Sequence, residues 1–153
     1  MERSLDPMIV QPGAGCDLHA FGNTLSVMLA GENTGGMLSV MVESTPPGGG
    51  PPLHVHNHED EIFLVIEGNI QYYINDDWIE VKPGGVVYLP RGTAHCYRNI
   101  GDTPSRHWII VTPSGFEQFF AHCASEFASA SGPDMQRIGS IHQEHGIELL
   151  EQG

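Results

Sequence analysis

Glycine and proline cut most of this chain into short apolar runs. Its 19 glycines and 11 prolines fall largely between these runs, in segments such as 46–52 and 83–85 that have turn chemistry. Eight or nine short strands so closely spaced leave no room for crossover helices, which predicts an all-β domain with antiparallel sheets. The expected strands are Thr24–Ala30, Met37–Glu43, Leu53–His56, Glu61–Glu67, Ile70–Ile74, Trp78–Val81, Val86–Leu89, His95–Asn99 and His107–Thr112.

The character of the sequence changes after Pro113. Ser114, with Glu117 three residues later, predicts a capping box at the start of a helix. The apolar residues that follow have helical spacing and form one stripe, which we interpret as a face packed on the β domain rather than as a cofactor site. The stripe consists of Phe116, Phe119, Phe120, Cys123 and Phe127.

A second helical pattern opens at Pro133-Asp134, and Gly146 is its expected C-cap. Its apolar positions are Met135, Ile138 and Ile141. The chain therefore divides into an N-terminal segment (1–22), a β domain (23–113) and a C-terminal helical extension (114–153).

The expected strand Glu61–Glu67 is apolar on both faces. Phe63 and Val65 share one face, and the other face carries Ile62, Leu64 and Ile66. A strand with one solvated face would alternate with polar residues. Either the C-terminal helices or a second subunit must therefore cover the second face, and we predict a homodimer.

Composition limits the partners of this chain. Lys and Arg number 6 against 19 Asp and Glu, and the formal net charge of −13 repels phosphate backbones and anionic lipid surfaces. We therefore expect neither nucleic-acid nor membrane partners. Cys16, Cys96 and Cys123 have no CxxC spacing, which fits a reducing compartment. No apolar run suits a signal peptide or a membrane span, so we expect a cytoplasmic protein.

Three of the nine histidines are arranged as metal ligands would be. His54 and His56 are two apart on an expected strand, so their imidazoles leave the same face. Glu61 opens the next strand, and His95 follows a turn ahead of a later one. Three imidazoles and one carboxylate suit a divalent transition metal and match Mg or Ca poorly. The expected cofactor is one ion of Fe, Mn, Ni, Co, Cu or Zn.

Side chains near these four residues are further candidates for metal ligands. His58 lies in the turn between the two strands, and we interpret it as solvated or as a contact of a ligand. If the motif is misplaced by one residue, Asp60 would be the carboxylate ligand in place of Glu61. Strand alternation points Cys96 away from the ligand face, so we interpret it as a packing residue. The remaining histidines have no partner at useful spacing and are treated as ordinary: His19, His107, His122, His142 and His145.

Two longer motifs resemble those of the cupin superfamily. Residues 49–68 read GGPPLHVHNHEDEIFLVIEG, which matches the first cupin motif of glycine, HxH, glutamate and a closing glycine. Residues 84–99 read GGVVYLPRGTAHCYRN, which matches the second motif of glycine, PxG, histidine and asparagine. The resemblance covers most of residues 20–113. The segments 33–36 and 47–50 look like those of a subgroup labelled quercetin-dioxygenase-like.

The resemblance implies a double-stranded β-helix, the cupin jelly-roll barrel, with the C-terminal helices packed outside. Its metal would lie inside the barrel. The ligands implied by the two motifs are His54, His56, Glu61 and His95. The six residues between Glu61 and Gly68 favour Glu61 over Asp60 as the carboxylate ligand.

The ligand set also implies a class of function. A metal site with open positions in an apolar barrel can polarise a substrate oxygen, and a redox metal can bring O₂ beside the substrate. We expect a dioxygenase-like enzyme that acts on a small oxygenated molecule, with Glu61 as ligand and proton acceptor. The alternatives are a non-redox isomerase, lyase or hydrolase and a non-catalytic small-molecule binder. The expected pocket wall consists of Phe63, Val65, Val87 and Tyr97.

Overall fold

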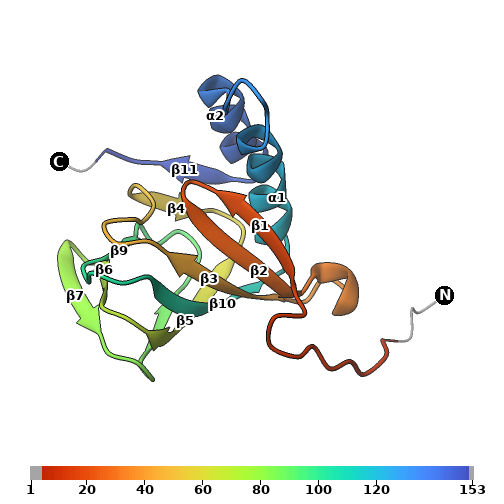
Figure 1. The fold of residues 1–153 in the computed structure, drawn as a ribbon, viewed down its shortest axis with the longest axis horizontal. Helices are drawn as coiled ribbons and strands as arrows, with labels where there is room; N and C mark the ends of the chain where they lie inside the picture. Colours follow the sequence, from red (N-terminus) through yellow and green to blue (C-terminus); the bar gives the residue numbers. More distant parts are fainter. Residues whose placement is uncertain (1–4, 152–153) are drawn as a thin grey trace.

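Two facing antiparallel sheets form the body of the molecule in the computed structural model, which describes residues 5–151 (Figure 1). The larger sheet has the order β1-β2-β3-β10-β5-β8, and the smaller has the order β7-β6-β9. The strands of the larger sheet are β1 (Cys16–Ala20), β2 (Asn23–Leu29), β3 (Ser39–Thr45), β10 (Ser105–Thr112), β5 (Asp60–Glu67) and β8 (Val86–Leu89). Those of the smaller sheet are β7 (Asp77–Val81), β6 (Ile70–Ile74) and β9 (Cys96–Asn99).

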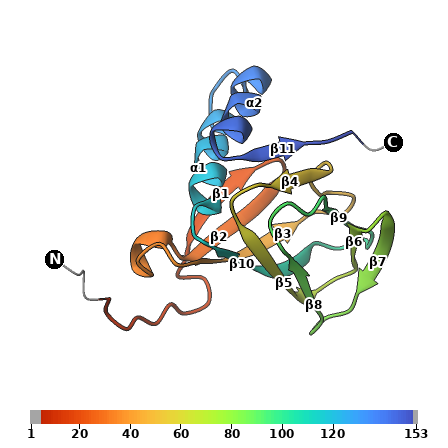
Figure 2. The same cartoon turned by 180° about the vertical axis from the view of Figure 1, so that it is seen from behind.

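A third, two-stranded pair lies at one end of this body. β4 (His54–His56) pairs with β11 (Ile147–Leu149), and an isolated bridge between His54 and His95 joins β4 to the start of β9. The helices α1 (Phe116–Phe127) and α2 (Met135–Glu144) lie over the same end (Figures 1 and 2). A 3₁₀ turn at Gly31–Asn33 follows β2.

Strand alternation decides which side chains face the interior. β5 buries Glu61, Phe63 and Val65, while the residues between them are half-buried on the outer face. Side chains from the two sheets meet between them, as where the rings of Phe63 and Tyr72 lie 5.5 Å apart. The same alternation carries the polar side chain of Glu61 into the interior together with its apolar neighbours.

The expected all-β, antiparallel domain is confirmed, and each of the nine expected runs overlaps a strand. The sequence patterns missed β1 and β11. β1 has a polar or small residue at most positions, and β11 has only three residues, so neither gives a periodic apolar signal. β1 lies inside the segment 1–22 and pairs with β2, and β11 lies inside the segment 114–153 and pairs with β4.

The outer face of the larger sheet is apolar where β8, β5 and β10 lie side by side. Ile62 and Leu64 of β5 are half-buried there, and Leu64 pairs with Trp108. Val86 and Tyr88 of β8 are 60% and 61% exposed. α1 packs mainly against β1 and α2. The homodimer that the two-sided pattern predicts would cover this face, and it stays a prediction.

The start of α1 differs from the expected capping box. Gly115, not Ser114, is the N-cap residue, and Ser114 instead donates its hydroxyl to the carbonyl of Gly36. Glu117 still reaches back over the helix end: its Oε2 accepts from the Gly115 amide at 3.0 Å. Its Oε1 accepts from the Gly31 amide at 2.9 Å. The buried Glu117 carboxylate therefore ties the start of α1 to the 3₁₀ turn.

The second helix begins as the sequence predicts. Asp134 is its N-cap residue, and its carboxylate accepts from the amides of Gln136 and Arg137. The residue after the C-cap is Gly146, whose φ of +67° lies in the left-handed region that favours glycine. In the described part of the chain, neither helix has the length and apolar character needed to cross a membrane.

The Glu117 clamp gives a test of how α1 is held. We expect Glu117→Ala to lower the free energy of unfolding by about 1–3 kcal/mol, because two amides lose their acceptor in a buried place. Urea denaturation followed by circular dichroism measures this change. The matched control is Gln118→Ala, an exposed position in the same turn, which we expect to change stability by less than about 0.5 kcal/mol. Equal losses in the two variants would contradict the clamp.

Candidate metal centre

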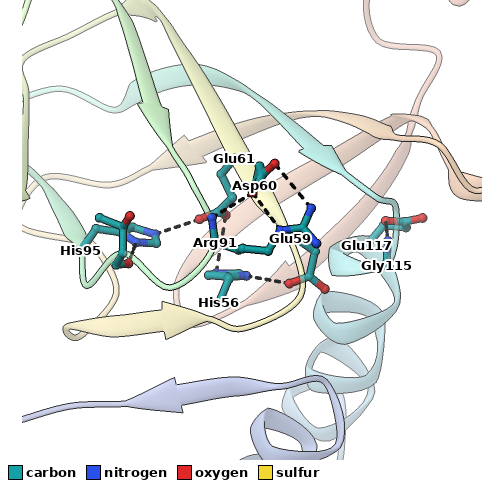
Figure 3. Close-up of polar contacts among 9 residues, drawn as sticks. His56, Glu59, Asp60, Glu61, Arg91, His95, Gly115 and Glu117 are labelled. Carbon is teal, nitrogen blue, oxygen red and sulfur yellow. Dashed lines mark hydrogen bonds and ion pairs between the residues drawn. The ribbon is translucent and has the colours of Figure 1, made fainter.

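Four polar side chains from three stretches of chain meet inside the barrel. β4 supplies His54 and His56, β5 supplies Glu61, and the residue just before β9 supplies His95. Their exposed fractions are 9%, 2%, 2% and 3%. We call these four residues the ligand cluster. Figure 3 shows Glu61 between His95 and His56, with Glu59 on the far side of the His56 ring.

Backbone carbonyls orient two of the imidazoles. The Nδ1 atom of His54 lies 2.8 Å from the carbonyl oxygen of Pro52, and that of His95 lies 2.9 Å from the carbonyl oxygen of Thr93. A carbonyl only accepts hydrogen bonds, so each Nδ1 must carry the proton. Each Nε2 then has a free lone pair, which is the state that a metal ligand requires.

A carboxylate orients the third imidazole. Oε2 of Glu59 lies 3.4 Å from Nδ1 of His56, so the Nε2 atom of His56 also faces the cluster. Glu59 is itself only 8% exposed. This carboxylate–histidine pair is the kind of support that fixes the ring orientation of metal-binding histidines in proteins.

The inner atoms of the cluster converge without satisfying one another. Nε2 of His95 lies 2.8 Å from Oε2 of Glu61, and Nε2 of His56 lies 3.5 Å from Oε1 of Glu61. Yet the two imidazole nitrogens and Glu61 Oε2 are buried and make no hydrogen bond within residues 5–151. The four ligand atoms lie within 4.8 Å of one another. Bonds of about 2.1 Å would place opposite ligands about 4.2 Å apart, so a cation fits the common point.

The surroundings of the cluster favour the ligand forms of Glu61 and His54, whereas the two carboxylates beside His56 favour its protonated form. Burial opposes ionisation of Glu61, but the imidazoles of His56 and His95 outweigh it and lower the Glu61 pKa to about 2. Burial, with the neighbouring imidazoles, lowers the pKa of His54 to about 3. Burial also works against a charged His56, but the Glu61 and Glu59 carboxylates outweigh it and raise that pKa. Glu61 is therefore an anion and His54 is neutral at neutral pH.

The structure separates the ligand cluster from the alternatives beside it. Asp60 turns outward, where its Oδ1 accepts from the backbone amide and Nε of Arg91 at 2.9 and 3.0 Å (Figure 3). His58 is exposed in the turn, and Cys96 is buried outside the cluster. Glu61 is therefore the carboxylate at the centre. This set of three nitrogens and one oxygen can hold one divalent transition metal.

The ligand cluster opens into a cavity of about 150 Å³. Of the expected pocket wall, Phe63 and Tyr97 do line this cavity. The other two expected residues, Val65 and Val87, are buried in the hydrophobic core and are not among its lining residues, which corrects that part of the sequence interpretation. Strand alternation correctly places Val65 and Val87 on the inner face of the sheet. It does not specify how far the cavity extends along the barrel.

Aromatic side chains of α1 form the other side of the cavity. Phe116, Phe119 and Phe120 line it, and the Phe116 ring lies 5.5 Å from the ring of His56. The sequence pattern identified these residues as an apolar stripe that packs on the β domain. They do pack there, but they also form a ceiling over the ligand cluster. Phe21, in the turn between β1 and β2, joins them.

A second polar group on the cavity was missed from the sequence. Glu43 of β3 lines the cavity and is 3% exposed, and Oε1 of Glu43 accepts hydrogen bonds from the Tyr97 hydroxyl and, at 3.2 Å, from Nε2 of His107. The Nδ1 atom of His107 lies 2.8 Å from the Tyr72 hydroxyl. We call Glu43, Tyr72, Tyr97 and His107 the Glu43 network. Burial and the Glu43 carboxylate raise the pKa of Tyr97, so its hydroxyl stays protonated.

The signal for this network was present but weak. Glu43 has the strand parity of the buried Met41, and His107 has the parity of the buried Ile109. A charged or polar residue at an inward position is unusual and indicates a buried partner. The two residues are 64 positions apart, however, and only the β3–β10 register, which local patterns do not specify, shows that they face each other.

A family model matches the central part of this chain. The Cupin_2 model, for the cupin domain, matches residues 41–112, which run from within β3 to the end of β10 and include all four members of the ligand cluster.

Two curated relatives overlap this region. Quercetin 2,3-dioxygenase of Bacillus subtilis is 26% identical over 114 residues, which cover 74% of this chain and 34% of the relative. The oxalate-binding protein of Thermotoga maritima is 33% identical over 66 residues, which cover 43% of this chain and 54% of the relative. The chain thus spans about a third of the first relative and about half of the second.

A solved structure shares the fold. The crystal structure of a predicted oxalate decarboxylase from Thermotoga maritima aligns with a TM-score of 0.64 at 20% identity and covers 69% of this chain and 99% of that protein. A likeness at this level of identity establishes the fold alone. The expected double-stranded β-helix with C-terminal helices is thereby confirmed.

Removing two ligands tests the cluster directly. We expect wild-type protein to retain about one equivalent of transition metal through desalting, and a His56→Ala/His95→Ala double variant to retain almost none. Elemental analysis by mass spectrometry measures the content, and circular dichroism checks that the barrel remains folded. The matched control is His58→Ala, which removes an exposed neighbouring imidazole and should leave the metal content unchanged. A double variant that still holds a full equivalent would show that the ligands are elsewhere.

The contact between Glu59 and His56 predicts that loss of Glu59 weakens metal binding less than loss of two ligands does. Glu59→Gln keeps the shape of the side chain but removes the charge that holds Nδ1 of His56, so we expect metal affinity to fall about 10- to 100-fold. Competition with a chelating dye measures the dissociation constant. Glu148→Gln, an exposed carboxylate on β11, is the control for a lost negative charge. The role assigned to Glu59 is wrong if both variants bind metal like the wild type.

Proposed function

Residues 41–112 of this chain are a cupin domain, and from that premise we propose that the protein is a metal-dependent, dioxygenase-like enzyme acting on a small oxygenated molecule with a single ring. The observation that carries the proposal is a set of three buried histidines and one buried glutamate at the end of an aromatic-lined cavity. Such a site combines a possible transition-metal ligand set with a largely apolar cavity beside it.

Each part of the site has a role in this proposal. A redox-active divalent metal, when bound, supplies Lewis acidity and one-electron chemistry toward O₂. Glu61 is the anionic member of the cluster and the proposed acceptor of the substrate's hydroxyl proton. The rings of Phe63 and Phe116 border the cluster, where they exclude water and orient a flat substrate.

The size of the cavity favours a small substrate. At about 150 Å³ it equals the engineered, apolar cavity of about 150 Å³ that binds benzene in another protein. One ring with its oxygen substituents fits this space. A ligand of several fused or linked rings would require the aromatic ceiling of α1 to move.

The comparison with quercetin 2,3-dioxygenase of Bacillus subtilis supports an oxygenase. That relative acts, by its name, on a phenolic compound through addition of dioxygen. The match covers a third of its length, so the proposal takes from it the type of chemistry and not the substrate. The size of the cavity, a property of this chain, supports the proposed substrate class.

A non-redox function is the second candidate. The oxalate-binding protein of Thermotoga maritima is named for binding a ligand and not for a redox reaction. A non-redox isomerase, lyase or hydrolase would use the same ligand cluster as a Lewis acid. Oxygen consumption separates both of these functions from an oxygenase.

The test is oxygen uptake on protein loaded with defined metals. We expect protein loaded with Fe²⁺, Mn²⁺ or Ni²⁺ to consume oxygen with single-ring catechols or single-ring β-diketones, and protein loaded with Zn²⁺ to consume none. An oxygen electrode measures the rate, and the His56→Ala/His95→Ala variant treated with the same metals is the control for free metal. Absence of uptake with every redox metal and both ligand classes would reject the oxygenase and favour the non-redox candidate.

A further inference from the structure

The Glu43 carboxylate lies on the cavity at a distance from the ligand cluster. Across β10, the register places Ser39 of β3 level with Val111 and Glu61. Glu43 is four residues further along β3, which is roughly 13 Å along the strand direction. Both Glu43 and Glu61 line the same cavity. The cavity therefore has two carboxylates, one in the ligand cluster and one beyond it.

The Phe63 ring separates these two polar regions. Its centroid lies 6.5 Å from that of His95, a member of the ligand cluster, and 4.9 Å from that of His107, a member of the Glu43 network. A ligand that reaches from one region to the other must therefore pass an apolar face. This arrangement suits a flat ring with a polar group at each end.

The hydrogen bonds of Glu43 leave one oxygen for a ligand. The Tyr97 hydroxyl and Nε2 of His107 both donate to the same atom, Oε1. These two donors stabilise an anionic carboxylate in a buried place. Oε2 of Glu43 is then the atom that can accept from a molecule in the cavity.

A second acceptor lies on the neighbouring strand. Asn23 of β2 lines the cavity and is 6% exposed, and its Oδ1 is buried without a hydrogen bond in the described part of the chain. Leu25, two residues along β2, pairs directly with Glu43, so Asn23 and Glu43 face the same interior. A buried oxygen without a donor is costly unless a bound molecule supplies one.

We propose that Glu43, with Asn23, is a second binding site in the cavity, which takes a hydroxyl or N–H donor at the end of the ligand remote from the metal. The inference rests on the proposed function, because it assumes that the other end of the same ligand binds the metal through oxygen. It narrows the substrate class to single-ring molecules with a metal-binding oxygen at one end and a hydrogen-bond donor at the other. The selecting atoms are two oxygens, which accept hydrogen bonds and repel an anionic substituent.

The test uses two catechols that differ by one hydroxyl group. Protein loaded with Zn²⁺, which avoids oxidation of the ligand, is titrated with 4-methylcatechol and with 4-(hydroxymethyl)catechol in an isothermal calorimeter. We expect wild-type protein to bind the hydroxymethyl compound about tenfold more tightly, as is typical of a hydrogen bond to a charged acceptor. We expect Glu43→Gln to reduce this preference to about twofold or less, because the acceptor loses its charge.

Controls separate ligand recognition from a structural role of Glu43. The zinc content of the Glu43→Gln variant should match that of the wild type, and only the ratio of the two affinities should change. Glu67→Gln, an exposed carboxylate paired with Arg106, should keep the full preference. If the Glu43→Gln variant does not fold, the wild-type ratio decides the question alone.

The outcomes distinguish this inference from the proposed function. Equal binding of both catechols by the wild type would overturn the second binding site and leave the metal-dependent function standing. An unchanged tenfold preference in a folded Glu43→Gln variant would overturn the role of Glu43. Binding of neither compound to the zinc-loaded protein would reject the proposed function for phenolic ligands, and the inference would fall with it.

Discussion

The structure depends on four buried ligand atoms that face one another with no donor between them. Two of the imidazole nitrogens and one carboxylate oxygen are buried and make no hydrogen bond within residues 5–151, and burial makes each of these unsatisfied atoms costly. A divalent cation would resolve this conflict, because all four residues can each offer one ligand atom to it. The strands hold the arrangement in place: alternation sets which side chains turn inward, and the bridge between His54 and His95 brings two of the ligands together.

The surrounding groups orient the cluster as the ligands of a metal would be oriented. Carbonyls and one carboxylate hold the outer nitrogen of each imidazole, which leaves the inner nitrogen free. The barrel alone does not enclose this centre, however. The ceiling of the cavity comes from α1, which follows the last strand of the larger sheet, and from Phe21 in a turn near the start of the described chain. The ligand cluster and the aromatic residues that cover it thus come from different parts of the sequence.

Local patterns predicted the parts of the site that depend on local geometry. His54 and His56 share a face because side chains alternate along a strand, and the structure brings both to the interior. The Glu43 network escaped notice because its members meet only through the register of strands far apart in sequence. Val65 and Val87 show the limit of parity arguments, since parity gives the face of a strand but not the depth of a cavity. β11 was not predicted because its three residues are too few to show a periodic apolar pattern.

One pairing has a consequence for the chain as a whole. β4 carries two of the four ligands, and its strand partner is β11, which comes last of all the described strands. A cation bound by the side chains of His54 and His56 would hold β4 in place, and the backbone of β4 pairs with β11, so binding of the cation would also favour the docked state of β11. Occupancy of the metal centre and docking of β11 would then be linked equilibria, and the position of β11 would depend on the metal.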